Sequence, residues 1–136
     1  LFQFNDVAAP DTVSVAVGEA CSLYAYDSTS GGRVVRVEPW PASCGGKACP
    51  PAWTMTFPAG SEVRVAANGG STFAIAERTS ATDVQLKKLT LDGSCQGSPV
   101  VTATLTIPAA AAFRPVVQSG APAMVWLDGT SLKVSR

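Results

Sequence analysis

The residue types that most often carry out chemistry are scarce in this chain. Among 136 residues there is no histidine, and ten Asp and Glu balance ten Lys and Arg. Histidine is the commonest general base, so nucleophilic catalysis here would need a lysine or a carboxylate in that role. The candidate lysines lie in predicted loops or exposed strands, and none follows a Ser-x-x-Lys motif on a helix; they are Lys47, Lys87, Lys88 and Lys133. The sequence therefore predicts a protein that is not an enzyme.

The remaining chemical motifs are weak. Aspartates occur in Asp92-Gly93 and Asp128-Gly129, where hydrogen bonding of the side chain to a turn backbone is a better explanation than paired-carboxylate catalysis. Gly45-Gly46-Lys47 lacks both the upstream glycine and the following Ser or Thr of a phosphate-binding loop. Calcium held by turn aspartates stays an alternative, although no Asp-x-Asp-x-Asp loop is present. We expect no cofactor and no metal.

The four cysteines indicate a disulfide framework. Cys21, Cys44, Cys49 and Cys95 allow three pairings. Gly45-Gly46 can form the tight turn that a Cys44–Cys49 bridge needs, which leaves Cys21 to pair with Cys95 and to stabilise the fold by roughly 4 kcal/mol. A four-cysteine zinc site and free core thiols are the alternatives, but only one pair has zinc-knuckle spacing. Disulfides favour an extracellular location or a cell or virion surface, with this chain as the mature form of a secreted precursor.

The composition excludes several classes of partner. The net charge is zero and only 15% of residues are charged, so nothing favours binding to nucleic acid. The longest uncharged stretch, residues 97–113, is too polar and too interrupted by proline to insert into a membrane as a helix. A surface with so little charge favours self-association over repulsion between molecules.

Alternating apolar and polar residues predict an all-β fold. Nine to eleven short strands with turns every eight to twelve residues indicate one antiparallel β-sandwich over residues 1–136, immunoglobulin-like or jelly-roll-like, without a substantial helix. Cys21 and Cys95 resemble the immunoglobulin pair in position only, because Asp92-Gly93-Ser94-Cys95 lacks the tyrosine of that family's corner. A bulge is expected near Lys87-Lys88. The apolar faces predict these residues to be mostly buried: Val13, Val15, Leu23, Val35, Trp53, Met55, Val65, Phe73, Ile75, Leu86, Leu105 and Trp126.

One segment differs from the strands around it. Residues 38–52 hold four prolines and the expected Cys44–Cys49 bridge, so they form a rigid loop that loses little entropy on binding. In a binding module, Trp40 and Lys47 on this loop would act with Tyr24 and Tyr26, the aromatic residues of a glycan or protein platform. The alternative is that Trp40 folds back as a lid on the sandwich.

We expect a structural or assembly subunit of an extracellular or virion surface, such as a pilus, filament, decoration or adhesin domain. It would form a homo-oligomer or bind another surface protein through strand edges at its termini. Leu1, Phe2 and Phe4 make one terminus apolar, and residues 131–136 have the same potential. A monomeric module that binds glycans or proteins is the alternative, and a small-molecule carrier or an inhibitor is a third possibility.

Overall fold

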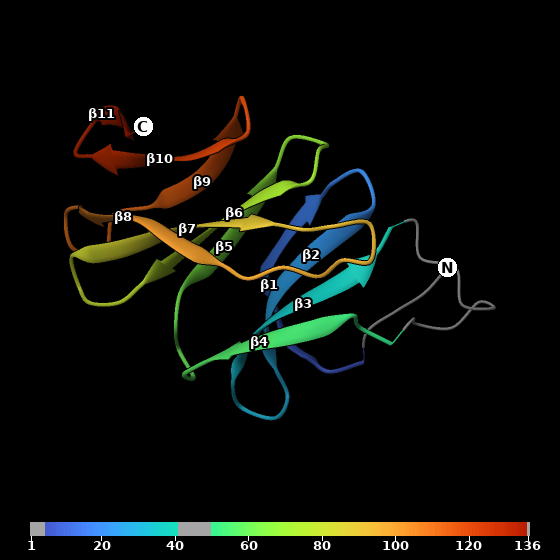
Figure 1. The fold of residues 1–136 in the computed structure, drawn as a ribbon. Helices are drawn as coiled ribbons and strands as arrows, with labels where there is room; N and C mark the ends of the chain where they lie inside the picture. Colours follow the sequence, from blue (N-terminus) through green and yellow to red (C-terminus); the bar gives the residue numbers. More distant parts are fainter. Residues whose placement is uncertain (1–4, 41–49, 136) are drawn as a thin grey trace.

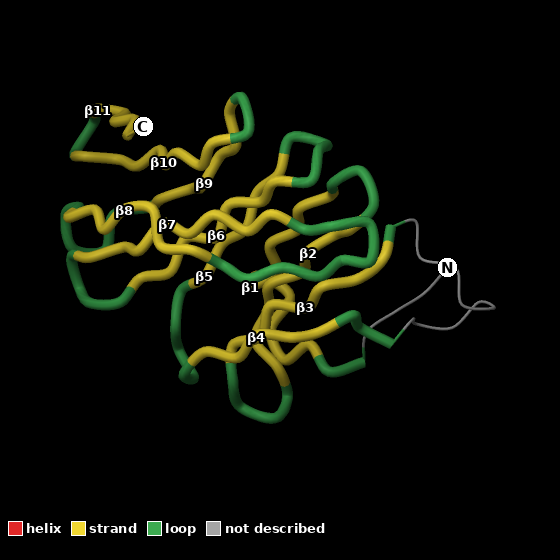
Figure 2. The backbone as a smooth tube through the Cα atoms, in the orientation of Figure 1, coloured by secondary structure: helices red, strands yellow, loops and turns green. Residues whose placement is uncertain are grey.

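The computed structural model describes residues 5–40 and 50–135, and within them every regular element is a β-strand (Figures 1 and 2). There are eleven strands in this part of the chain: β1 (Val7–Val17), β2 (Cys21–Ser28), β3 (Arg33–Pro39), β4 (Trp53–Phe57), β5 (Val63–Ala67), β6 (Thr72–Arg78), β7 (Asp83–Thr90), β8 (Val100–Thr106), β9 (Phe113–Gln118), β10 (Ala121–Asp128) and β11 (Ser131–Ser135). None of the described residues forms a helix long and apolar enough to cross a membrane. The predicted all-β class is confirmed.

The strands form three antiparallel sheets. Sheet A contains β1-β2-β3-β4, sheet B contains β5-β6-β7-β8, and sheet C contains β11-β10-β9, each in this order. Neighbours in space are therefore neighbours in sequence, which defines a meander and differs from the strand order of a Greek key. The immunoglobulin-like and jelly-roll subtypes are not confirmed.

Sheet B lies between the other two sheets and contributes to two cores (Figure 1). On β6, Phe73 and Ile75 belong to the core shared with sheet A, whereas Ala74 and Ala76 belong to the core shared with sheet C. All four side chains have no exposed surface. A strand covered on both faces reads as a continuous apolar run, and this explains the segment FAIA.

Two polar contacts join sheets A and B besides the apolar core. The Ser14 hydroxyl of β1 accepts a hydrogen bond from the Val65 amide of β5 at 3.1 Å and lies 3.4 Å from the Val65 carbonyl. Arg33 of β3 is 3% exposed; it donates to the Val63 carbonyl at 2.8 Å and pairs with Asp27 at 3.1 Å. A buried guanidinium with these partners fixes how the two sheets meet.

The phase of β1 is the opposite of the predicted one. Val13 and Val15 were expected in the core, but they are 40% and 50% exposed, and Val17 is 38% exposed. Ser14 and Ala16 point inward instead, where Ser14 bonds to β5 and Ala16 packs in the core between sheets A and B. Small inward side chains allow β1 to approach β5 closely, and this need overrides the hydrophobicity of the valines.

The other burial predictions divide into two groups. Six of the residues are at least 95% buried: Leu23, Val35, Val65, Phe73, Ile75 and Leu86. The remaining four are half-buried and pack on the margins of the two cores: Trp53, Met55, Leu105 and Trp126. The β7–β8 register shifts between Leu86 and Lys87, close to the expected bulge, but the extra residue is Thr102 of β8, and β7 pairs with β6 without a shift.

Candidate interaction surfaces

The structure buries one of the aromatic residues that were predicted to form a binding platform. Tyr26 is only 1% exposed and Tyr24 is half-buried, so the prediction of two exposed tyrosines is wrong for Tyr26. Trp40 follows β3 directly and is 38% exposed, with its backbone amide bonded to the Ala20 carbonyl at 2.9 Å. Lys47 and the Cys44–Cys49 pair lie outside the described residues, as do Leu1, Phe2 and Phe4. The role predicted for the 38–52 loop stays a prediction.

The outer face of sheet A carries a polar network that includes Tyr26. The Tyr26 hydroxyl donates to an Asp6 carboxylate oxygen at 2.8 Å, and Arg36 pairs with Glu38, whose side chain is 1% exposed. Burial and then the Asp6 hydrogen bond raise the pKa of Tyr26, against an opposing hydrogen bond from Arg36. Burial alone would lower the pKa of Arg36, but hydrogen bonds to Glu38 and Tyr26 raise it. Arg36 is charged and Tyr26 is protonated at neutral pH already at their ordinary pKa values, and the network shifts both pKa values further in that direction.

Sequence reasoning missed this network. The valines of residues 33–38 indicate a strand, but the strand also carries Arg33, Arg36 and Glu38. Charged residues at every second or third position of a buried strand indicate that they pair within the protein. Arg36 balances the charge of Glu38, although one Glu38 carboxylate oxygen is buried without a hydrogen-bond partner in the described chain. The network therefore favours a structural role over the binding of a ligand.

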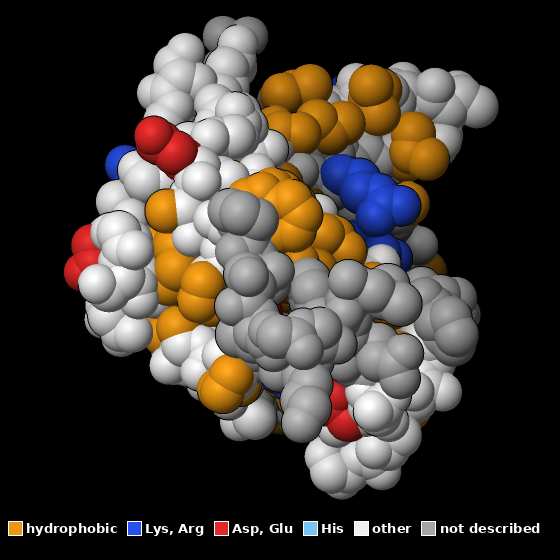
Figure 3. Space-filling view, turned by 90° about the vertical axis from the view of Figure 1, so that its right-hand side faces the viewer, with side chains coloured by type: hydrophobic (Ala, Val, Ile, Leu, Met, Phe, Trp, Pro, Cys, Tyr) orange, Lys and Arg blue, Asp and Glu red, His pale blue; other side chains and the backbone are white. Residues whose placement is uncertain are grey.

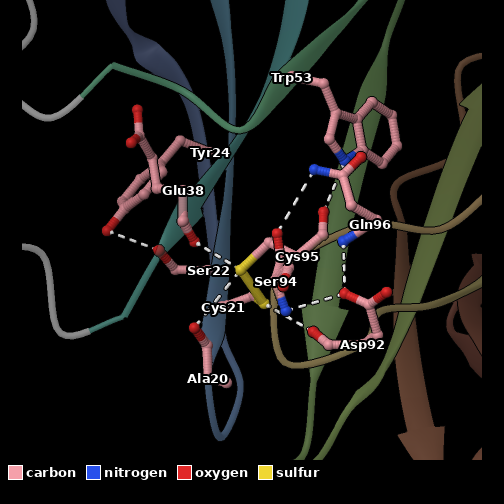
Figure 4. The surroundings of a disulfide bond; sticks show 10 residues. All are labelled: Ala20, Cys21, Ser22, Tyr24, Glu38, Trp53, Asp92, Ser94, Cys95 and Gln96. Carbon is pink, nitrogen blue, oxygen red and sulfur yellow. Dashed lines mark hydrogen bonds between the residues drawn. A yellow bond between two sulfur atoms is a disulfide. The ribbon is translucent and has the colours of Figure 1, made fainter.

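The predicted Cys21–Cys95 disulfide is present and ties sheet A to the segment after β7 (Figure 4). Both cysteines are at least 97% buried. Trp53 of β4 donates its indole N–H to the Cys95 carbonyl at 2.7 Å. On the other side of β3, the Glu38 side chain joins the outer network while its backbone carbonyl lies 3.7 Å from the Cys95 sulfur. The disulfide, Trp53 and β3 thus form one interlocked unit.

The turn that presents Cys95 is built around Asp92. One Asp92 carboxylate oxygen accepts from the Ser94 and Gln96 amides at 2.8 and 3.0 Å, and the Cys95 amide donates to the Asp92 carbonyl at 3.0 Å. These bonds hold Cys95 at a φ of 62°, a conformation that costs a non-glycine residue energy. Asp92 therefore has the turn role predicted for it.

A cavity of about 280 Å³ lies beside the disulfide. Phe73 and Leu91 contribute apolar lining, Glu19 and Asp92 contribute carboxylates, and Gly70 contributes backbone. The volume is below the usual range for small-molecule sites. Among the described residues no three His, Cys, Asp or Glu side chains form a group that could hold a metal ion.

The three most exposed large apolar side chains of the described chain lie on β11 and β8. Leu132 is 66% exposed, Val134 57% and Leu127 44%. Leu132 pairs with Leu127 across the ladder and Val134 pairs with Val125, so these four residues share the face of sheet C that points away from sheet B. Ser131 and Lys133 alternate with them on the opposite face. β11 is thus an edge strand with an apolar outward face and little covering on either side.

The hairpin geometry shows which backbone groups of β11 are unpaired. Only two residues, Gly129 at a φ of 61° and Thr130, separate Asp128 from its partner Ser131, as in a type II′ turn. The pair that closes such a hairpin is hydrogen-bonded, and the bonding alternates along the ladder. Lys133 therefore bonds to β10, whereas the amides and carbonyls of Leu132 and Val134 point toward the free edge.

The sheet edges at β9, β1 and β8 are protected. β9 has Pro115, which has no amide hydrogen to offer, and β1 is bridged to β5 by Ser14. β8 exposes Val100 and Val101, but it follows Pro99, is distorted by the bulge in its ladder, and places mostly threonines on its exposed side. β11 has neither a proline nor a bulge. It is better suited than the β9, β1 and β8 edges to accept another strand.

A space-filling view of one face shows the low surface charge that the composition indicates. Hydrophobic side chains reach the surface in several groups on the face drawn in Figure 3, and one of these groups adjoins a cluster of Lys and Arg side chains. Charged side chains are otherwise few on this face. Such surfaces favour contact with other proteins over contact with polyanions.

Comparison with known proteins gives no relative. No protein-family model matches the chain, and neither the curated proteins nor the solved structures contain a match. The functional inference therefore depends on the chain's own surfaces.

Proposed function

We propose that this chain is a non-catalytic assembly domain of an extracellular or surface structure, and that it acts by binding other protein subunits through sheet C. The observation that carries the proposal is the β11 edge: unpaired backbone groups of Leu132 and Val134 coincide with exposed side chains of the same residues. Strand addition uses the backbone groups for affinity and the side chains for specificity. The Cys21–Cys95 disulfide supports an oxidising location.

The energetics favour an assembly of many weak contacts. Burying the exposed parts of Leu127, Leu132 and Val134 would contribute about 1 to 2 kcal/mol each. Association costs several kcal/mol in lost freedom, so one such contact binds weakly unless backbone hydrogen bonds are added. Repeated contacts in a filament or layer would make the assembly stable through multivalency.

A monomeric glycan-binding module has less support. Such a module needs exposed aromatic rings, and Tyr26 is buried in a network with Asp6 and Arg36. Trp40 is the one residue of the proposed platform with a substantially exposed side chain among those described. No specific observation favours this function over assembly.

Light scattering over a range of concentrations tests the proposal. The mass of the intact chain should rise with concentration, and Leu132→Lys with Val134→Lys should suppress the rise. Ser131→Lys is the matched control for Leu132→Lys alone, because it adds the same single charge to the same strand on the opposite face. A wild-type chain that stays monomeric at millimolar concentration would refute the proposed function.

A further inference from the structure

We propose that the strand accepted by β11 is residues 1–5 of a second copy of this chain, which pairs antiparallel with Phe4 opposite Leu132 and Phe2 opposite Val134. This inference rests on the proposed function and names its partner. The acceptor is defined by described residues of sheet C, and the donor by its sequence.

The exposed edge sets three requirements for its partner. The added strand must offer backbone groups to Leu132 and Val134, which are the residues whose amides and carbonyls point outward. It must place apolar side chains on the same face as Leu132 and Val134. It must also avoid a positive charge opposite Lys133, because like charges directly across a ladder are destabilising.

A second β11 strand fails the third requirement. Two antiparallel β11 strands can use the outward backbone groups of both Leu132 and Val134 in one register only. In that register Leu132 of each copy lies opposite Val134 of the other copy. That register brings the two Lys133 residues directly opposite each other in the closely spaced type of pair. Lys133 thus acts as the kind of edge lysine that prevents pairing between identical strands.

Residues 1–5 meet all three requirements. The segment Leu1-Phe2-Gln3-Phe4-Asn5 has no charged side chain and alternates its two aromatic residues with Gln3. In the proposed register Phe2 and Phe4 lie beside Val134 and Leu132, and pairs of aromatic with aliphatic residues are favourable across strands. The Gln3 amide oxygen then lies opposite Lys133, where it can accept a hydrogen bond from the ammonium group.

The donor must come from another molecule. Asp6 is held at its own sheet A, because its carboxylate accepts from the Tyr26 hydroxyl at 2.8 Å and its carbonyl from the Thr29 amide at 2.7 Å. Five extended residues span about 17 Å, which equals the length of a five-residue strand such as β11. β1 and β11 belong to sheets A and C, with sheet B between them (Figure 1). The segment therefore reaches the β11 edge of a neighbouring copy in place of its own.

This arrangement produces an open chain of subunits. Donor and acceptor are different surfaces of one molecule, and a contact of that kind leaves an unused donor at one end and an unused acceptor at the other. Growth continues until the ends meet in a ring or the supply of subunits is exhausted.

Mixing two complementary variants tests the proposal. A chain lacking residues 1–5 keeps the acceptor, and Val134→Pro keeps the donor while removing an amide that points to the free edge; proline is tolerated at such positions. Each variant alone should associate at least about tenfold more weakly than wild type. The equimolar mixture should form a 1:1 dimer that grows no further. If Val134→Pro does not fold, Val134→Lys replaces it as the variant whose acceptor edge is disabled.

The outcomes separate the two proposals. A deletion variant that self-associates like wild type, or a mixture that stays monomeric while wild type assembles, would overturn residues 1–5 as the donor and leave assembly through sheet C standing. Register is tested by mixing Gln3→Cys with Lys133→Cys under oxidation, which should give more mixed disulfide than Gln3→Cys with Ser131→Cys. Equal yields would overturn the proposed pairing.

Discussion

Two identical substitutions in sheet A should have very different effects on stability. Val35 of β3 faces the core and has no exposed surface, whereas Val15 of β1 faces outward and is 50% exposed. Threonine has nearly the shape of valine, but it carries a hydroxyl group. In Val35→Thr this hydroxyl would be buried among apolar side chains without a partner, whereas in Val15→Thr it would be hydrated.

The expected difference is large enough to measure. An unsatisfied buried hydroxyl costs about 1 to 3 kcal/mol, so Val35→Thr should lower the free energy of unfolding by about 2 kcal/mol. For a chain of this length that loss corresponds to a fall in Tm of roughly 8 °C. Val15→Thr should change the free energy of unfolding by less than about 0.5 kcal/mol, as surface substitutions usually do.

Urea unfolding of the two oxidised variants measures both values. Because Val35 is buried and Val15 is exposed, the urea midpoint should fall clearly for Val35→Thr and hardly change for Val15→Thr. Equal losses would show that Val15 is buried and that the register of β1 against β2 is wrong.

Three further predictions concern the disulfide unit and its neighbours. Replacing Cys21 and Cys95 together by Ala should cost about 4 kcal/mol, measured by urea unfolding, because the bridge joins residues 74 positions apart; a loss below about 1 kcal/mol would contradict the loop-entropy argument. Trp53→Phe removes the donor to the Cys95 carbonyl and should cost about 1 to 3 kcal/mol in the same assay, whereas an unchanged midpoint would show that water replaces the indole. The pKa of Tyr26 in the folded state is raised above the ordinary value of 10. Its contribution to the free energy of unfolding is therefore complete below pH 10 and is lost as the pH rises through the pKa of the folded state. Between pH 9 and 11 wild type should therefore lose more stability than Tyr26→Phe, and parallel curves would contradict this.

Local patterns predicted the class of the fold and much of the core. Alternation gave the inward faces of β2, β3 and β6 correctly because each of these strands has apolar neighbours on the side that it buries. The Cys21–Cys95 pair followed from elimination among the cysteines. The Asp128-Gly129 dipeptide located the turn between β10 and β11, although the two connecting residues are Gly129, at positive φ, and Thr130.

Features that depend on the packing of sheets could not be read in this way. The pattern of β1 has the same period whichever face is buried, and only the Ser14–Val65 contact decides the phase. The apolar run of β6 is typical of a strand covered on both faces, but it does not tell that the cover over Ala74 and Ala76 is a third sheet. Tyr26 has the same place in the alternation as Tyr24, but it is buried and hydrogen-bonded to Asp6 and Arg36, which lie on other segments.

Hydrogen exchange at β11 is the most direct test of association through this strand. The Lys133 amide bonds to β10, so it should be protected at every protein concentration. The Leu132 and Val134 amides point to the free edge and should exchange rapidly in dilute solution. They should become at least about tenfold more protected when the chain is concentrated enough to assemble. Leu132 and Val134 amides that exchange equally fast in dilute and assembled samples would contradict strand addition at this edge.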